Sequence, residues 1–107
     1  MRYLMTTTIN ETRQDEQLFT EMAKFVEELT AAGILLATGG LAPRATLVSS
    51  EDGRITVTDG PFAEAKEVAA GFALVEVASK EEALELARRF RRIVGDGDSV
   101  IQEVFTP

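Results

Sequence analysis

Residues 2–9 alternate between two faces in the manner of a β-strand. Tyr3 and Met5 fall on one face, whereas Leu4 and Thr6 fall on the other. The second face is rich in threonine, which forms strands well but is less apolar than a buried face normally is. We therefore expect this face either to be exposed, at the surface or at a sheet edge, or to line a polar cleft.

Residues 14–32 predict an amphipathic helix, because apolar side chains recur there every three or four positions. Thr12 and Asp15 have the spacing of a weak capping box at its start. Gly33 follows the last turn and fits a left-handed C-terminal cap. The apolar stripe, which we expect to lie in the core, consists of Leu18, Met22, Phe25 and Leu29.

Residues 34–38 form a short apolar run between glycines, which predicts a second, well-buried strand. Gly39, Gly40 and Pro43 are expected to end it. These glycines lack the spacing of a phosphate-binding loop, so we predict a bend or a bulge in preference to a ligand-binding loop.

Two runs of strand-forming residues, 45–49 and 54–58, flank the turn sequence Glu51-Asp52-Gly53. Asp-Gly between two such runs is a strong hairpin signal. The predicted hairpin leads directly into Asp59, so it can act as a rigid arm that positions this carboxylate.

The last third of the chain repeats the pattern strand, helix, strand. Residues 71–77 predict a strand in the centre of the sheet. Ser79 and Glu82 form a capping box for a helix that runs to about Ile93, and residues 99–105 predict the final strand.

This order of elements indicates an α+β, ferredoxin-like fold. Two split βαβ units form an antiparallel sheet with both helices on one face, and the hairpin is inserted between them. The other face of the sheet stays uncovered. We therefore expect a homodimer in which two copies pack sheet to sheet, or edge to edge, about a two-fold axis.

The 107 residues are the size of a single domain, residues 1–107, and carry a net charge of −7. This charge argues against binding to nucleic acid or to anionic membranes. Arg88-Arg89 and Arg91-Arg92 follow acidic residues of the same helix, which suits the helix dipole. We interpret them as a solvated helix end, and the alternative is a docking patch for an acidic protein partner.

The chain contains neither cysteine nor histidine. Disulfides, thiolate nucleophiles and nearly all zinc or non-haem iron sites are thereby excluded, together with the usual general base. Asp96 and Asp98 lack the later acidic ligand of a calcium loop, so we expect no metal site and no cofactor. No signal peptide or membrane-spanning run is apparent, and we expect a cytoplasmic protein.

The run of residues 58–67 carries the most local information. Gly60 permits unusual backbone angles, Pro61 fixes φ, and Asp59 can accept backbone N–H bonds in a turn. If the run is a small-molecule site, Asp59 is the candidate catalytic residue, as a general base or an orienting acceptor. The candidate ligand contacts are Tyr3, Arg13, Arg44, Phe62, Glu64 and Lys66. In the structural alternative, Asp59 caps the turn and Phe62 fills the core.

The same run also carries a family resemblance. The chain resembles the DGPF-type branch of the YCII-related family over nearly its whole length. The matching segments are Arg2-Tyr3, Phe25–Leu29 before Ala32–Leu35, Gly40-Leu41 with Pro43, Thr56–Glu64, Lys66-Glu67 and Gly71-Phe72. The resemblance implies a ferredoxin-like domain that pairs as a dimeric α/β barrel, and most members have no established activity.

In the wider family a His–Asp pair has been proposed as a catalytic centre, and Asp59 matches its Asp. The histidine has no counterpart here, and Gly39 stands where this branch often has an acidic residue. The resemblance therefore implies a dimeric small-molecule-binding domain, or a cryptic enzyme with a cleft near Asp59. The alternative is a non-enzymatic interaction module linked to transcription, since related domains occur beside sigma factors.

Overall fold

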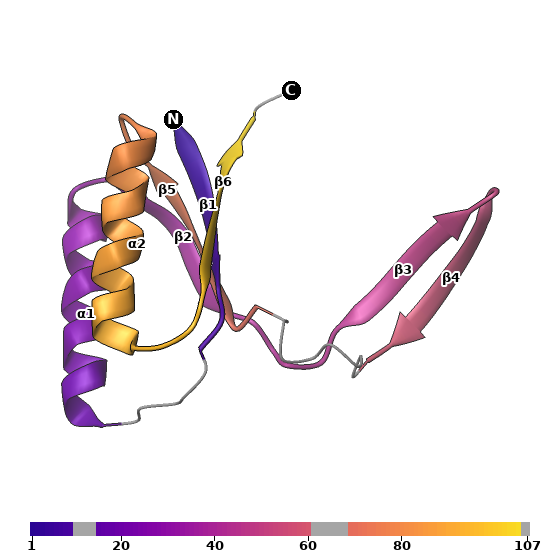
Figure 1. Ribbon diagram of the computed structural model, residues 1–107, viewed down its shortest axis with the longest axis horizontal. Helices are drawn as coiled ribbons and strands as arrows, with labels where there is room; N and C mark the ends of the chain where they lie inside the picture. Colours follow the sequence, from indigo (N-terminus) through magenta and orange to yellow (C-terminus); the bar gives the residue numbers. More distant parts are fainter. Residues whose placement is uncertain (10–14, 61–68, 106–107) are drawn as a thin grey trace.

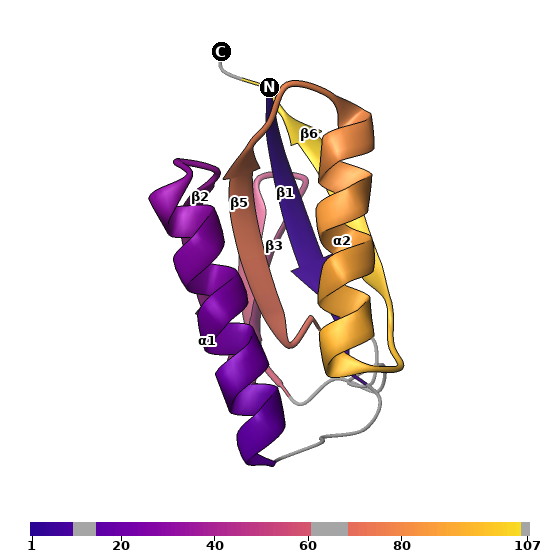
Figure 2. The same cartoon turned by 90° about the vertical axis from the view of Figure 1, so that its left-hand side faces the viewer.

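A four-stranded antiparallel sheet covered by two helices forms the body of the protein, and a separate hairpin projects from it (Figures 1 and 2). The computed structural model describes residues 1–9, 15–60 and 69–105. Its elements are β1 (Arg2–Thr7), α1 (Glu16–Ala31), β2 (Leu35–Gly40), β3 (Thr46–Glu51), β4 (Arg54–Asp59), β5 (Gly71–Glu76), α2 (Lys80–Val94) and β6 (Ser99–Val104).

The strand order in the sheet is β2-β5-β1-β6, and every neighbouring pair is antiparallel. Each helix connects two strands that are not neighbours, as a split βαβ unit requires. Both helices lie on the same face, with α1 on the β2–β5 side and α2 on the β1–β6 side (Figure 2). The predicted ferredoxin-like α+β fold is confirmed, as is the central position of β5.

The core lies between this face and the helices. Tyr3 of β1 and Val75 of β5 are cross-strand partners, and both are buried against Phe25 and Leu29 of α1 and Leu86 of α2. Strand alternation therefore directs one set of side chains toward the helices and the next set toward the uncovered face.

Side-chain caps define where both helices start. The Asp15 carboxylate accepts a bond of 2.7 Å from the backbone N–H of Leu18, so Asp15 is the N-cap of α1. The sequence predicted Thr12 as the capping residue, with Asp15 three positions later. Thr12 lies outside the described residues, and α1 begins at Glu16, two residues later than predicted. The Ser79 hydroxyl accepts from the N–H of Glu82 at 3.2 Å, as predicted for α2. Gly33 has φ +73°, which confirms the predicted left-handed cap.

The prediction of a well-buried second strand is wrong. In this topology β2 is an edge strand, and Leu36 is 45% exposed. Gly39 and Gly40 belong to the strand and do not end it, although a register shift lies earlier, between Leu35 and Ala37. A Cβ at Gly39 would come within 3.1 Å of the Phe72 ring, so a larger residue there would require this ring to shift.

The predicted hairpin is confirmed, with β3 and β4 paired from Thr46–Asp59 to Glu51–Arg54. Asp52 and Gly53 have φ values of +51° and +76°, which are typical of a two-residue turn of the primed type. The hairpin points away from the sheet on the side opposite the helices (Figure 1).

The sheet face turned away from the helices carries several apolar side chains beside Thr6 and Gln102. Leu4, Phe72 and Leu74 are half-buried on it, and Val100, the cross-strand partner of Thr6, is 53% exposed. This is the face of β1 that carries Leu4 and Thr6, and it lies at the surface of the single chain. We call it the open face.

Candidate functional site

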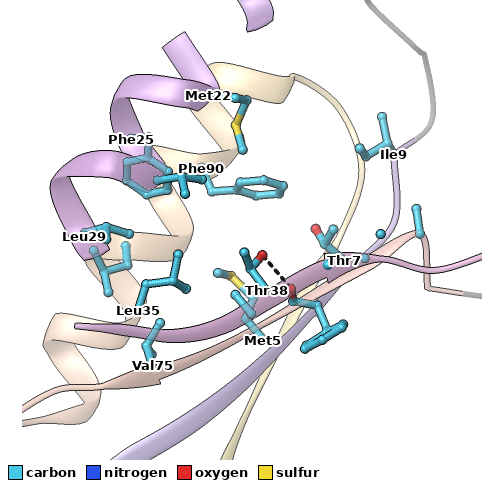
Figure 3. Close-up of a pocket in the computed structure, with 18 residues that line it drawn as sticks. Met5, Thr7, Ile9, Met22, Phe25, Leu29, Leu35, Thr38, Val75 and Phe90 are labelled. Atoms are coloured by element: carbon cyan, nitrogen blue, oxygen red, sulfur yellow. Dashed lines mark hydrogen bonds between the residues drawn. The ribbon is translucent and has the colours of Figure 1, made fainter. Parts of the chain in front are cut away.

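A cavity of about 320 Å³ lies between the two helices and the sheet, near the end of β1 (Figure 3). Side chains from both layers line it. They include Met5, Met22, Phe25, Leu29, Leu35 and Phe90.

The cavity exists because the sheet floor carries little side-chain volume at this point. Gly40 of β2 pairs with Gly71 of β5, and Ala73 of β5 pairs with both Met5 and Thr38. All five residues line the cavity. A helix packed on a floor of glycine and alanine cannot close the space with its own side chains.

Two threonines supply the polar groups of the lining. Thr7 is 7% exposed, and its hydroxyl oxygen accepts a bond of 2.9 Å from Arg91 Nη1 and lies 2.9 Å from Ser99 Oγ. The Thr38 hydroxyl donates to the backbone oxygen of Phe72 at 2.9 Å (Figure 3). Thr38 is exposed at the edge strand, so the cavity meets solvent beside β2.

None of the described lining residues has a titratable side chain. They are apolar or hydroxyl-bearing, and the two hydroxyls already have protein partners. Such a lining suits binding of an apolar molecule and offers no general acid or base of its own.

Arg91 connects three elements at the polar end of the cavity. Its guanidinium donates to the Thr7 hydroxyl and the Thr8 backbone oxygen at 2.9 Å each, and to the Gly95 backbone oxygen at 2.8 Å. It therefore ties the end of α2 to the end of β1 and to the loop before β6, and it holds the Thr7 side chain in place.

Arg89 holds the two helices together. It makes a bidentate ion pair with Glu28 of α1 at 2.8 and 3.0 Å, and its guanidinium lies 4.8 Å from the centre of the Phe25 ring. The hydrogen bonds from Arg89 lower the pKa of Glu28, and those to Glu28 raise the pKa of Arg89.

The interpretation of the arginine cluster as a solvated helix end holds for only part of it. Arg88 and Arg92 are exposed and pair with Glu85 at 3.3 and 3.5 Å. Arg89 and Arg91 are half-buried and make the contacts described above. Spacing along the helix predicted that these arginines lie near its end. It did not predict the partners of Arg89 and Arg91, because Glu28 lies on α1 and Thr7 lies on β1.

Asp59 lies at the base of the hairpin, exposed, where its carboxylate accepts a bond of 2.9 Å from the Thr46 hydroxyl. Next to it, the buried Gly60 donates to the Ala45 oxygen at 2.7 Å, and Arg44 donates to the Gly60 oxygen at 3.4 Å. The structure thus brings the candidates Arg44 and Asp59 into one cluster, which is separate from the cavity lining.

Tyr3 lies in the core, is 5% exposed and does not line the cavity. Burial raises its pKa, and the negative charges of Glu103 and Glu81 raise it further. Of the other candidate ligand contacts, Arg13, Phe62, Glu64 and Lys66 lie outside the described residues.

Within the ranges that the structure describes, no three acidic side chains gather in a way that could hold a metal ion. In the same ranges, no helix is long and apolar enough to span a membrane.

The cavity is the functional feature that sequence reasoning missed. The signal was the small residues Gly71 and Ala73 on the inward side of a central strand, opposite the phenylalanines of two helices. These small residues indicate a cavity only when the pairing of β5 with β2, which places Gly40 beside Gly71, is known.

Comparison with known proteins agrees with the fold and the residue pattern. The model of the YCII-related domain matches residues 1–100. The chain belongs to the YCII-related family. An uncharacterized protein of Rhizobium meliloti (strain 1021) is 36% identical over 77 residues, which are 70% of this chain and 62% of that protein. The chain thus spans less than two thirds of the length of this relative.

A solved structure supports the fold assignment of this YCII-related protein. It is a 5-chloro-2-hydroxyhydroquinone dehydrochlorinase from Burkholderia phenoliruptrix AC1100, in complex with 2,5-dihydroxybenzoquinone. The TM-score is 0.52 at 13% identity, and the match covers 100% of this chain and 96% of the other. At this identity the likeness concerns the fold.

Proposed function

We propose that this YCII-related domain binds a small, flat, largely apolar molecule in the cavity between the helices and the sheet. The observation that carries the proposal is the cavity of about 320 Å³, which is lined mostly by apolar side chains. Small-molecule sites commonly have volumes from about 300 Å³ upward, and far smaller apolar cavities accept benzene. Phe25, Phe90 and Met22 provide ring faces and a polarizable sulfur that favour an aromatic or quinone-like ring.

A hydroxylated ring is the preferred ligand class. The Thr38 hydroxyl uses its proton on the Phe72 oxygen, so its lone pairs remain able to accept a bond from a ligand hydroxyl. The structural neighbour was solved with a dihydroxylated quinone, which makes this ring type a suitable probe.

The test is a binding titration followed by NMR, with phenol, toluene and 2,5-dihydroxybenzoquinone as probes. The variant Ala73→Leu fills the cavity from its floor and should abolish binding while the protein stays folded. Ala37→Leu adds the same side chain on the open face, because Ala37 pairs with Leu74, and should bind normally. Equal binding by both variants, or no shift with any probe at millimolar concentration, would overturn the proposal.

We further propose that the chain belongs to the DGPF-type branch of the family. In this proposal, Asp59 serves a second site, which faces solvent. The run Asp59-Gly60-Pro61-Phe62 and the neighbouring Arg44 support this proposal. As an exposed carboxylate, Asp59 can orient a ligand donor or accept a proton. Asp59→Asn should reduce ligand binding or any detected turnover at least tenfold without changing Tm. An unchanged affinity and turnover would assign Asp59 to the hairpin base alone.

We also propose that the protein is a homodimer paired through the open face. Its support is that Leu4, Phe72, Leu74 and Val100 lie together on one face. Apolar residues grouped in this way mark interaction surfaces more often than apolar residues scattered singly do. Sedimentation of Val100→Glu should show a weakened dimer, whereas Ala23→Glu on the exposed side of α1 should leave it intact. A wild-type chain that stays monomeric at all concentrations would contradict pairing.

A further inference from the structure

The β3–β4 hairpin has one apolar and one polar face. Cross-strand register places Val48 opposite Val57, and Ile55 lies one pair nearer the turn on the same face. These three side chains are 64%, 65% and 68% exposed. The other face carries Ser49 opposite Thr56 and the charged pair Glu51–Arg54, with Leu47 as its only large apolar residue. We call the surface of Val48, Ile55 and Val57 the arm face.

The hairpin receives no cover from the described part of its own chain. All twelve residues of β3 and β4 are exposed, and within the described residues these strands pair only with each other. A two-stranded hairpin alone is at best marginally stable in water. Three adjacent β-branched apolar residues therefore need a surface to pack against.

The position of the hairpin indicates what covers it. It leaves the body on the side of the open face, opposite the helices (Figure 1). Six-residue strands reach about 20 Å, whereas two stacked sheets lie only about 10 Å apart. A second copy stacked on the open face would therefore lie within reach of the hairpin.

Charge restricts how such a second copy can bind. Copies that each carry −7 repel one another, so their contact must be apolar and largely free of charge. The arm face meets this condition, because its charged neighbours are Asp59 at the base and the residues of the turn. The same net charge disfavours an anionic membrane as the surface that covers it.

We propose that the arm face of each chain packs against the body of a second copy, so that two hairpins clasp the dimer reciprocally. This inference rests on the homodimer proposed above. Under two-fold symmetry each chain gives one hairpin and receives one, so the hairpin contact occurs twice and adds to the contact between the open faces.

The first experiment compares Val57→Glu with Thr56→Glu by sedimentation equilibrium. Both changes add one negative charge to β4, on the arm face and on the polar face respectively. Val57→Glu should raise the dimer dissociation constant at least tenfold, and Thr56→Glu should change it less than twofold. A wild-type dimer with equal responses in both variants would overturn the clasp and leave the dimer standing, whereas a monomeric wild type would overturn both.

The second experiment uses the absence of cysteine from the chain. Val57→Cys and Thr56→Cys each introduce a single thiol, whose alkylation rate under reducing conditions is measured across protein concentrations. The thiol of Val57→Cys should react at least tenfold more slowly when the dimer forms, whereas that of Thr56→Cys should keep its rate. Equal rates, or protection that is independent of concentration, would overturn the inference.

Discussion

At the scale of single residues, Tyr3 shows how strand alternation decides the role of a side chain. From the sequence it was a candidate ligand contact, yet it shares the inward face of β1 with Met5 and Thr7 and lies in the core. Alternation predicted which residues share a face. The low apolar content of the face with Leu4 and Thr6 also favoured exposure of that face, so the burial of Tyr3 on the opposite face followed from the same pattern.

Tyr3 is the only tyrosine, and the chain has no tryptophan, so its titration can be followed directly by phenolate absorbance. Burial, and then Glu103 and Glu81, raise its pKa. We expect a midpoint above the ordinary value of about 10 in the folded protein and an ordinary midpoint in urea. Since the folded pKa is raised, the neutral phenol stabilises the fold below about pH 10, and this stabilisation is lost as pH rises through the folded pKa. An unshifted folded midpoint would contradict this burial.

The ion pair between Glu28 and Arg89 gives a second residue-scale prediction. Because hydrogen bonds from Arg89 lower the pKa of Glu28, the pair stabilises the fold above the ordinary glutamate pKa of about 4.3. Glu28→Gln should therefore lower the free energy of unfolding at pH 7. The deficit should shrink as pH falls through the folded pKa of Glu28.

Chemical denaturation at pH 7 and at pH 3 measures this difference. Glu27→Gln is the matched control, because it removes the same charge from the neighbouring exposed position on α1. A deficit for Glu28→Gln that is independent of pH, or one that Glu27→Gln shares, would contradict a specific role for the pair.

At the scale of elements, periodicity predicted both helices and all six strands to within a few residues. Capping residues, the Asp-Gly turn and the apolar spacing are local signals, so they can be recognised without knowledge of the fold. The predicted burial of β2 was wrong because an apolar run of five residues has the same pattern in a central strand and in an edge strand. Leu36 lies at the register shift of this edge strand and is 45% exposed.

Arg91 provides the element-scale prediction. It joins α2, β1 and the loop before β6 through several backbone and hydroxyl oxygens. Lysine keeps the charge but cannot reproduce a planar fork of donors. Arg91→Lys should therefore destabilise the fold by about 1–3 kcal/mol, since it leaves half-buried acceptors unpaired.

Urea unfolding of Arg91→Lys and Arg88→Lys tests this prediction. Arg88 is exposed and pairs only with Glu85 among the contacts found, so its replacement should cost less than about 0.5 kcal/mol. Equal effects of the two substitutions would mean that Arg91 does not tie these elements together.

At the scale of the whole molecule, the cavity and the direction in which the hairpin projects are the features that the sequence did not predict. The cavity is assembled from β1, β2, β5 and both helices, so no single stretch contains its signal. Arg44 and Asp59 flank the predicted hairpin, and the structure brings them together at its base. Their separation from the cavity between the helices and the sheet depends on the hairpin leaving the sheet (Figure 1), which local patterns do not determine.

A ligand that enters the cavity binds only the folded chain, so it must raise the stability of the whole domain. At a probe concentration of 100 times its dissociation constant, the gain is about 2.7 kcal/mol. For a domain of about this size, each kcal/mol shifts Tm by about 4–8 °C, so Tm should rise by about 10 °C or more. The rise should grow with the logarithm of the probe concentration.

Thermal unfolding of the wild type and of Ala73→Leu, with and without 2,5-dihydroxybenzoquinone, measures this linkage. The variant should unfold at a Tm equal to or above that of the free wild type, because leucine occupies space that is otherwise empty, and the probe should not shift it further. A probe-induced rise of equal size in both proteins would mean that the stabilising site lies elsewhere, and the cluster of Asp59 and Arg44 would then be the next place to look.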